Sequence, residues 1–460
     1  MTTTTGTPLN EQGAGAAASE ISASRTRKRY LVLAMLFLVT TINYADRATL
    51  SIAGPALSKE MGIDTVTMGY VFSAFGWSYV VAQLPGGWLL DRFGSKKVYA
   101  WSILLWSLFT LLQGSVGFIA SLTGSAVVAL FSLRLLVGAA EAPSFPANGR
   151  IVAAWFPANE RGTASAIFNS AQYFATVLFA PLMGWITHTW GWHAVFEVMG
   201  VIGLVAVVLW HKLVFSPKTH PSVNRAELDY IAQGGALVQM DQGGQQVKAK
   251  IEGPRWDYIR QLLGNRMMMG VYLGQYCINT LTYFFLTWFP VYLVKERGMS
   301  ILNAGFVAAL PAICGFAGGV LGGLISDALL RRGRTLTLAR KLPIVIGLLL
   351  STSMIACNYV ESSAVVVAIM ALAFFGKGLG ALGWAVVSDT SPREISGLSG
   401  ALFNSFGNIA AITTPIVIGY LVKGTGSFSA ALVFVAANAL VAVCCYLFVV
   451  GEIRRFELKK

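Results

Sequence analysis

Charged side chains are scarce in this sequence. Asp, Glu, Lys and Arg make up 12% of the 460 residues, whereas 55% are hydrophobic, and the mean hydropathy is +0.64. Soluble domains carry about twice this share of charge, roughly 25%. The composition therefore excludes an ordinary soluble protein and indicates a chain whose solvent is the lipid bilayer.

Metal-ligand spacings and catalytic motifs are also missing. The sequence has no HExxH, GxSxG or Walker motif, and its four histidines do not pair at metal-binding intervals. Its five cysteines all lie inside apolar stretches, as expected for core packing: Cys277, Cys314, Cys357, Cys444 and Cys445. We therefore expect no metal, no cofactor and no enzymatic activity.

No cleavable signal peptide is evident, because the first 24 residues are rich in Thr, Ala, Gly and Ser and lack an apolar run. The formal net charge of +13 could suggest nucleic acid as a partner. The basic residues, however, fall in short clusters between apolar runs. This pattern indicates membrane topology instead.

Apolar runs of about 20 residues, the length that spans a bilayer, recur along the chain. They predict an all-α membrane protein with twelve transmembrane helices in two six-helix bundles. The predicted spans are 30–50, 66–90, 97–118, 124–149, 162–185, 193–214, 266–293, 301–327, 342–358, 362–388, 396–422 and 428–451.

A polar central loop divides the spans into six and six. We predict a disordered cytoplasmic tail (1–28), an N-terminal bundle (29–214), the loop (215–265), a C-terminal bundle (266–452) and a short tail (453–460). The tails and the loops after even-numbered spans hold 27 of the 34 Lys and Arg residues. The positive-inside rule then places both termini and the central loop in the cytoplasm.

The two halves resemble each other in sequence. The stretch from Gly86 to Asp91 recurs from Gly322 to Asp327, and Gly162–Ser170 recurs as Gly397–Ser405 almost the same distance along the chain. Each pair falls on equivalent spans. Repeated six-helix halves around a midplane site are typical of secondary transporters, and a channel does not require them.

One loop resembles a signature of the major facilitator superfamily: Gly87-Trp-Leu-Leu-Asp91-Arg92-Phe-Gly94-Ser95-Lys96-Lys97. Ser95 departs from it, because a basic residue is usual there. In the first span, Asn43-Tyr44-Ala45-Asp46-Arg47 resembles the anion:cation symporter branch of that superfamily.

Further runs are similar to bacterial glucarate/galactarate transporters, and the resemblance covers about residues 29–455. They are Glu141–Pro146, Ala153–Pro157, Glu160–Tyr173, Phe375–Gly378 and Gly383-Trp384. The resemblance implies a proton-coupled symporter that imports a hexaric anion such as D-glucarate or galactarate across the bacterial inner membrane. The alternatives are a proton symporter of a monocarboxylate sugar acid (galactonate, hexuronate) and an organic-anion exchanger.

Five ionisable side chains fall inside predicted spans, where each costs about 3 kcal/mol or more and indicates function. Arg47 presents a planar fork suited to a substrate carboxylate, although an ion pair with Asp46 or Glu141 would also explain it. Asp46 leaves the helix about 100° away from Arg47. The resemblance assigns the matching aspartate to proton coupling, and a helix-packing hydrogen bond is the alternative.

Arg134 and Glu141 share one face of the fourth span, separated by about 10 Å along the axis. Glu141 precedes Pro143 and Pro146, where the helix must kink. We interpret Glu141 as a second proton carrier and Arg134 as the charge that it exchanges with. A static salt bridge is the alternative.

Lys377 lies 236 residues after Glu141, so the repeat places it opposite an acid of the other half. It could bind the second carboxylate of a dicarboxylic sugar acid while Arg47 binds the first. Snorkelling to an interface or pairing with Asp389 would also account for it.

Polyhydroxy substrates need hydrogen bonds and stacking as well. The resemblance implies substrate contacts from polar and aromatic residues of cavity-lining spans: Tyr44, Tyr79, Gln172, Trp384 and Asn404. Tyr283 is a weaker candidate, since it is chosen only because it lies 236 residues after Arg47.

The second span of each half ends in charged residues, which are Asp91 and Arg92 in the first half and Asp327 in the second. We expect them to lock neighbouring helices while the transporter faces outward, and to release on inward opening. The expected partners are a sugar-acid anion, protons and the bilayer, with a monomeric protein and no nucleic acid. An organic phosphate exchanger would prefer opposing arginines in spans 1 and 7, and a membrane sensor would carry a signalling domain; neither feature is present.

Overall fold

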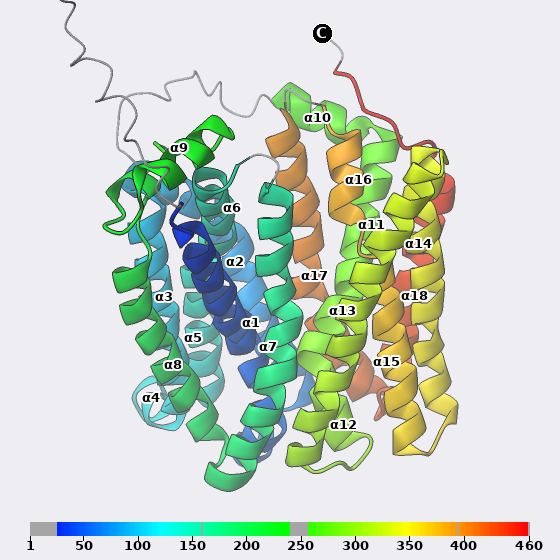
Figure 1. The fold of residues 1–460 in the computed structure, drawn as a ribbon. Coiled ribbons are helices and arrows are strands. Elements are labelled where there is room, and N and C mark those ends of the chain that lie inside the picture. Colours follow the sequence, from blue (N-terminus) through cyan, green and yellow to red (C-terminus); the bar gives the residue numbers. More distant parts are fainter. Residues whose placement is uncertain (1–24, 158–159, 240–255, 393–394, 459–460) are drawn as a thin grey trace, which may run out of the picture.

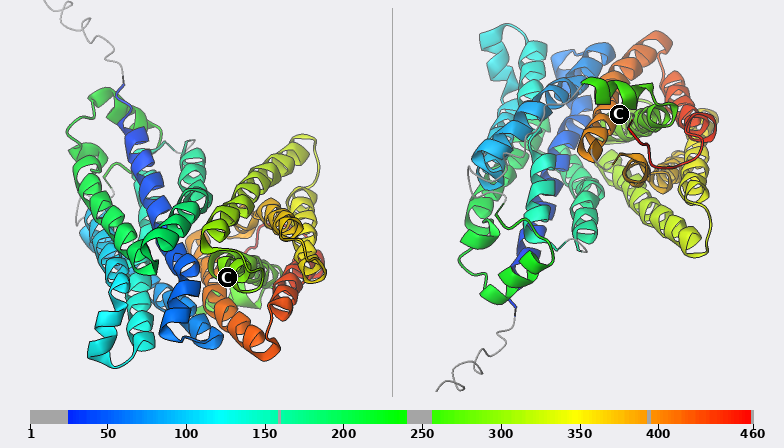
Figure 2. Two further views of the ribbon diagram at one scale, coloured as in Figure 1. Left: turned by 90° about the horizontal axis from the view of Figure 1, so that it is seen from below. Right: turned by 90° about the horizontal axis from the view of Figure 1, so that it is seen from above.

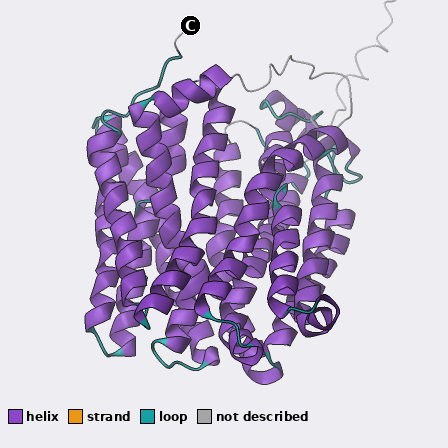
Figure 3. Cartoon of the chain, turned by 180° about the vertical axis from the view of Figure 1, so that it is seen from behind, coloured by secondary structure: helices purple, strands orange, loops and turns teal. Residues whose placement is uncertain are grey.

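The computed structural model describes residues 25–157, 160–239, 256–392 and 395–458. In these parts the chain is helical, with no strand (Figure 3). Most of the N-terminal tail (1–24) and the middle of the central loop (240–255) lie outside the described residues. The prediction that this tail is disordered therefore concerns residues that the structure does not describe.

The N-terminal half is built from helices that run back and forth between two ends of the molecule (Figure 1). They are α1 (Lys28–Met61), α2 (Thr65–Phe93), α3 (Ser95–Gly114), α4 (Val116–Thr123), α5 (Ala126–Glu141), α6 (Ser144–Trp155), α7 (Arg161–Trp190) and α8 (Trp192–Leu213).

The C-terminal half repeats this arrangement. Its helices are α11 (Arg266–Tyr283), α12 (Phe289–Lys295), α13 (Ile301–Arg331), α14 (Leu336–Ser351), α15 (Ser363–Leu379), α16 (Gly383–Thr390), α17 (Ser396–Thr425) and α18 (Ser429–Cys444). A π-helical turn (Phe284–Trp288) joins α11 to α12 in one span. Figure 2 shows the two halves side by side, one coloured blue to green and the other lime to red.

Polar caps and glycines set several helix ends. Asp64 caps α2 by accepting a hydrogen bond from Thr67 N, and Ser300 caps α13 in the same way through Asn303 N. Gly62 ends α1 with φ +66°, a left-handed conformation that other residues adopt only with strain.

The predicted spans agree with these helices, with one correction. Ten helices of the described chain are long and apolar enough to cross a membrane, or eleven when α3 and α4 count as one bent pair. Helix α2 stands outside that count because glycine, serine and polar aromatic residues lower its hydropathy. The predicted span 97–118 is wrong at its end, since the chain bends by 81° after Gly114 and α4 turns away.

The central loop contributes one helix to each half. Helix α9 (Arg225–Gln233) sits over the N-terminal half, whereas α10 (Trp256–Gly264) precedes α11 (Figure 1). We call the end of the molecule that carries α9 and α10 the loop end. The other end, where α4 and α12 lie, is called the far end.

The halves touch mainly along two pairs of helices, α2 with α17 and α7 with α13, and α1 also contacts α12 and the π-helical turn. Glycines allow this close approach towards the far end. A Cβ placed on Gly69 would lie 2.6 Å from Pro415 O, and one on Gly305 would lie 2.6 Å from Ala180 O. The far end is therefore packed shut in this conformation.

Candidate substrate and proton site

The central feature is an ion pair between two of the charges predicted to form the site, Arg47 and Glu141. Arg47 Nε donates a hydrogen bond to Glu141 Oε2 over 2.9 Å, joining the middle of α1 to the last residue of α5. Both side chains are buried, at 6% and 0% exposed. The ion pair that the sequence left as an alternative role for Arg47 is thus formed in this conformation.

A break in the fourth span positions Glu141. Helix α5 ends there, Ala142 and Pro143 interrupt the helix, and α6 starts at Ser144. The kink predicted from the prolines is confirmed. The equivalent span of the other half is also interrupted, between α15 and α16, and Lys377 lies just before that gap. Paired broken helices in the two halves are typical of transporter binding sites.

Aromatic rings surround the Arg47 guanidinium. Its Cζ atom lies 4.9 Å from the ring centroid of Tyr44, 4.7 Å from Phe75 and 4.9 Å from Tyr79. The rings of Phe75 and Tyr79 stack at 5.3 Å. Such rings hold a cation by its attraction to their faces and exclude competing water. Arg47 is therefore oriented, and its Nη2 has no hydrogen-bond partner among the described residues.

Asp46 and Arg134 form a second, looser part of the cluster. Both are buried, and the charged groups near Asp46 are Glu141 and Arg134. Neither carboxylate oxygen of Asp46 makes a hydrogen bond of ordinary geometry to a described residue, and Nε and Nη1 of Arg134 make none either. Arg134 therefore faces both acids, while the hydrogen bond to Glu141 comes from Arg47.

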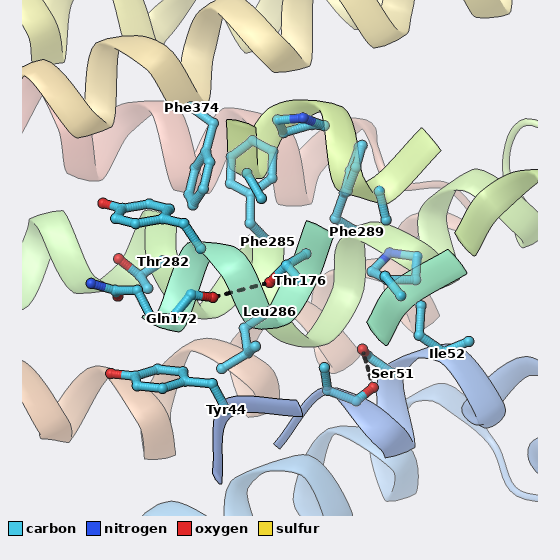
Figure 4. A pocket seen from close by; sticks show the side chains of 17 residues that line it. Tyr44, Ser51, Ile52, Gln172, Thr176, Thr282, Phe285, Leu286, Phe289 and Phe374 are labelled. Atoms are coloured by element: carbon cyan, nitrogen blue, oxygen red, sulfur yellow. Dashed lines mark hydrogen bonds between the residues drawn. The ribbon is translucent and has the colours of Figure 1, made fainter. Parts of the chain in front are cut away.

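A narrow cavity of about 50 Å³, partly open to solvent, lies between the two halves. This volume is well below the usual range for small-molecule sites, about 300–1,000 Å³, so the cavity is contracted in this conformation. Helices α1, α7, α13 and α15 and the α11–α12 span contribute its walls. Figure 4 shows the polar ends of Tyr44, Gln172 and Thr282 gathered at one end and the rings and chains of Phe289 and Ile52 at the other.

The buried cations stand just behind this cavity's wall. Tyr44 separates Arg47 from it, since the Tyr44 ring both lines the cavity and faces the guanidinium. Lys377 Nζ lies 5.1 Å from the ring centroid of Phe374 and 5.7 Å from that of Tyr173, and both rings line the cavity. The cavity is thus flanked by one cation from each half.

Lys377 has no anionic partner in the part of the chain that the structure describes. It is 5% exposed, and its surroundings are aromatic. Asp389, its possible partner from the sequence, instead accepts a hydrogen bond from Arg340 Nε over 2.8 Å. The sequence offered pairing with Asp389 as one explanation for Lys377, and this pair is not formed in the structure.

The other predicted substrate residues are distributed unevenly. Tyr44 and Gln172 line the cavity, and Tyr79 is buried against Arg47. Asn404 does not line the cavity, and its Nδ2 donates to Gln83 Oε1 over 3.5 Å across the two halves. Trp384 is more than half exposed on α16 and meets Phe403 edge to face. The structure therefore brings the first three together and leaves Asn404 and Trp384 nearer the loop end.

Several residues at the cavity are absent from the sequence prediction. Five of them supply hydroxyl groups or rings to its wall: Tyr173, Thr176, Thr282, Phe285 and Phe374. Tyr173 directly follows the predicted substrate residue Gln172, and this adjacency was the signal in the sequence that could have identified it. Tyr283 does not line the cavity, and its hydroxyl donates to Asn408 Oδ1 over 3.2 Å.

The predicted gating residues lie at the loop end and make contacts inside each half. Asp91 forms an ion pair with Arg150, which joins α2 to α6. Arg340 of α14 lies 3.9 Å from Asp327 and also pairs with Asp389 of α16. Arg92 lies over the rings of Trp88 and Phe93. Their role as locks stays a prediction.

A metal site finds no support in the described residues, where no three His, Cys, Asp or Glu side chains gather suitably. The site combines two buried cations beside a cavity, Arg47 and Lys377, with one carboxylate that pairs with Arg47 and a second buried carboxylate, Asp46, near Arg134. This is the chemistry of binding an organic anion and exchanging protons.

Comparison with known families agrees with this fold and site. The family model of the Major Facilitator Superfamily matches residues 36–340. The chain belongs to this superfamily of membrane transporters, and the predicted fold of two six-helix bundles is confirmed.

Individual relatives cover nearly the whole chain. The chain is 66% identical to the probable galactarate/D-glucarate transporter GudP of Bacillus subtilis (strain 168), over 95% of each chain. It is 63% identical to GudP of Escherichia coli (strain K12), over 96% of this chain and 98% of the relative. It is also 42% identical to the D-galactonate transporter of Escherichia coli O6:H1, over 94% and 98%.

Solved structures share the fold at low sequence identity. A D-xylose–proton symporter superposes with a TM-score of 0.70 at 16% identity, over 92% of this chain and 98% of that chain. The xylose transporter XylE from E. coli in an inward open conformation gives a TM-score of 0.70 at 15% identity, over 92% and 96%.

Proposed function

We propose that this chain is a proton-coupled symporter that imports galactarate or D-glucarate into a bacterial cell. Support comes from the superfamily match and from relatives that bear the name galactarate/D-glucarate transporter at 60–66% identity. The fold supplies the alternating-access framework. The site supplies the means to couple an anion to protons.

The observation that carries the proposal is the Arg47–Glu141 ion pair. While Glu141 is ionised it occupies the guanidinium that a substrate carboxylate needs. Protonation of Glu141 releases Arg47, and a buried cation without a partner costs several kcal/mol. The substrate carboxylate then takes over that partnership. Proton binding and substrate binding therefore favour each other.

Asp46 supplies the second proton site. It lies beside Arg134 and Glu141 and is shielded from the cavity. A hexarate carries two negative charges, so uptake with two protons, one on Asp46 and one on Glu141, adds no net charge to the closed site. A low net charge reduces the cost of closing the cavity in a low-dielectric interior.

Lys377 supplies the cation for the far carboxylate. It approaches the cavity from α15, in the half opposite Arg47, and its ammonium group makes no ion pair within the described chain. A dicarboxylate can then be held by one cation at each end. Hydroxyl groups of the sugar acid would meet Tyr44, Gln172, Thr176 and Thr282.

The membrane arrangement follows from charge. We place the loop end, both termini and the central loop in the cytoplasm, because most basic residues cluster there. The division into bundles 29–214 and 266–452 joined by the loop 215–265, a monomeric state and a multi-pass location in the inner membrane belong to the same proposal. The far end then faces outward, and this conformation is closed to the outside.

Uptake of labelled galactarate and D-glucarate into proteoliposomes tests the proposal. We expect accumulation when the outside is acidic, loss of accumulation with a protonophore, and no requirement for an internal anion. Accumulation that does not depend on the proton gradient, or no uptake of any sugar acid, would contradict the proposal. A strict requirement for an internal organic anion would identify an exchanger instead.

Two variants test the coupling. Glu141→Gln mimics the protonated acid, so we expect it to keep counterflow exchange of labelled for unlabelled substrate while gradient-driven uptake is lost. Arg47→Gln should lose both activities. Glu361→Gln, an exposed site between the ninth and tenth spans, serves as the matched control for the carboxyl change.

A further inference from the structure

We propose that a polar column on the inner face of α3 delivers protons to Asp46 from the far end of the molecule, separately from the substrate cavity. The column consists of Trp106, Thr110 and Gln113. This inference rests on the proposed proton coupling and adds the route by which one of the protons arrives.

The three side chains share one face of α3. They stand four and three residues apart, so they lie above one another along the helix. All three are buried, at no more than 1% exposed. Helix α3 packs against α5 and α8 inside the N-terminal half, so the column runs through that bundle and not between the halves.

The column residues carry polar atoms without hydrogen-bond partners among the described residues. These atoms are Trp106 Nε1, Thr110 Oγ1 and Gln113 Oε1. Other buried hydroxyls of the same bundle bond to their own helix: Ser107 Oγ donates to Ile103 O over 2.6 Å, and Thr187 Oγ1 to Met183 O over 2.7 Å. Thr110 differs from these two, as do Ser144 and Tyr99 elsewhere in the bundle, and its hydroxyl, free among the described residues, requires an explanation.

Buried polar groups of this kind are normally satisfied by ordered water, which conserves their hydrogen bonds. A file of polar atoms one helical turn apart can hold a chain of such waters. A chain of hydrogen-bonded waters and hydroxyls passes a proton along without moving an ion. Trp106, which donates but cannot accept, would orient the chain and not relay the proton.

The inner end of the column meets Asp46. The Trp106 indole N–H faces the Asp46 carboxylate, whose two oxygens lack partners of ordinary geometry. Glu141 and Arg134 of α5 are the other charged groups there. The Asp46 carboxylate is the base at which the column ends, so the proton comes to rest there, and the Arg134 cation opposes passage of a hydronium ion beyond it.

The outer end meets titratable groups at the far end. His193 Nδ1 lies 2.6 Å from Gly114 O, next to Gln113, and His193 Nε2 lies 3.6 Å from Glu60 Oε1. The side chains of His193 and Glu60 are 42% and 58% exposed. Glu197 of α8 also borders Gly114. These groups can collect a proton from solvent and pass it to the column.

The proposed step is a proton transfer only. A hydronium ion or protonated His193 gives up a proton at the far end, each water hands one proton inward, and an O–H bond forms on Asp46. Asp46 does not line the cavity, whereas Glu141 pairs with Arg47 behind the cavity-lining ring of Tyr44. Asp46 would thus load from the column while Glu141 responds to the substrate.

The test compares Thr110→Val, which removes the hydroxyl at nearly constant shape, with Thr110→Ser, which restores it. Gln113→Leu interrupts the column at a second point. Thr390→Val is the matched control, because Thr390 is equally buried but donates to Val386 O within α16. Two measurements are made on each variant. The first compares the rate of gradient-driven uptake with the rate of counterflow exchange. The second is the rate of hydrogen–deuterium exchange at the Asp46 carboxyl, followed by infrared spectroscopy in the band that Asp46→Asn removes.

We expect Thr110→Val and Gln113→Leu to slow gradient-driven uptake and carboxyl exchange about tenfold or more, with counterflow nearly unchanged and Thr110→Ser close to wild type. Exchange rates equal to those of Thr390→Val in both column variants would overturn the proposal. If the wild-type protein shows no gradient-driven uptake, the proposed coupling fails, and the carboxyl exchange still decides whether the column conducts protons.

Discussion

Lys423 Nζ donates a hydrogen bond to Asp64 Oδ2 over 2.8 Å, tying the last turn of α17 to the residue that caps α2. The two residues belong to different halves and meet at the far end. The hydroxyls of Tyr70 and Tyr420 lie 3.3 Å apart on the same two helices. Together these four residues form what we call the outer latch, which holds the far end closed.

The outer latch should not contribute to the pH dependence of transport near neutrality. Hydrogen bonds from Lys423 and Thr67 lower the pKa of Asp64 to about 2. A carboxyl with a depressed pKa stabilises the closed state above its ordinary pKa, about 3.9, and loses this contribution only as the pH falls towards 2. Asp64→Asn should therefore change the uptake rate by the same factor at every pH between about 5 and 8.

Uptake measured across that pH range, with the internal pH fixed, checks the prediction. Asp229→Asn is the control, since its i,i+4 pair with Arg225 is solvent-exposed. A ratio of variant to wild-type rate that varies through this range would mean that the latch does titrate during the cycle.

Gly69→Val should favour opening of the far end. A Cβ at this position would lie 2.6 Å from the backbone oxygen of Pro415, which cannot move aside without separating α2 from α17. Gly87→Val is the matched control on the same helix, because a Cβ there has nothing within 4 Å.

The readout is the reactivity of Ser51→Cys, placed in a cysteine-free background, towards an impermeant thiol reagent added outside. Ser51 lines the cavity, so its labelling reports opening. We expect faster labelling with Gly69→Val than with Gly87→Val, and equal rates would contradict the packing argument.

Lys377→Gln should distinguish dicarboxylates from monocarboxylates. Loss of one charge-assisted contact costs about 2 kcal/mol, or about thirtyfold in affinity. We expect this loss for galactarate and D-glucarate, and a much smaller one for galactonate, which has a single carboxylate for Arg47. Competition of each acid against labelled galactarate gives the affinities. Lys341→Gln is the control, because Lys341 lies on α14 and does not line the cavity. Equal losses for both classes would remove Lys377 from the substrate site.

Glu227→Ala should destabilise the N-terminal half. Glu227 of α9 is fully buried and accepts hydrogen bonds from Thr26 Oγ1 (2.7 Å), Lys28 N (3.0 Å) and Arg29 N (3.2 Å) at the start of α1. Removal takes these hydrogen bonds from the start of α1 and leaves Glu160 as the remaining ion-pair partner of Arg29, at a cost of about 2 kcal/mol. Thermal unfolding of the detergent-solubilised protein should show a lower Tm, whereas Asp229→Ala, on the exposed side of α9, should leave it unchanged.

The sequence determined the arrangement of helices to a large extent, because hydropathy and charge act locally. Twelve apolar runs, the repeat and the clustering of basic residues are readable without knowing which helices touch. The end of α3 was not readable in this way, because α4 remains apolar after the 81° bend and hydropathy does not register direction.

The sequence also identified the five buried charges of the predicted spans, since an ionisable residue in an apolar run stands out by its cost. Tertiary structure decided how they are connected. The spacing of Arg134 and Glu141 on one helix suggested that they interact, yet packing of α1 against the broken fourth span gives the Glu141 hydrogen bond to Arg47. The cavity wall and the α3 column likewise depend on which faces of distant helices meet, and helix packing alone determines that.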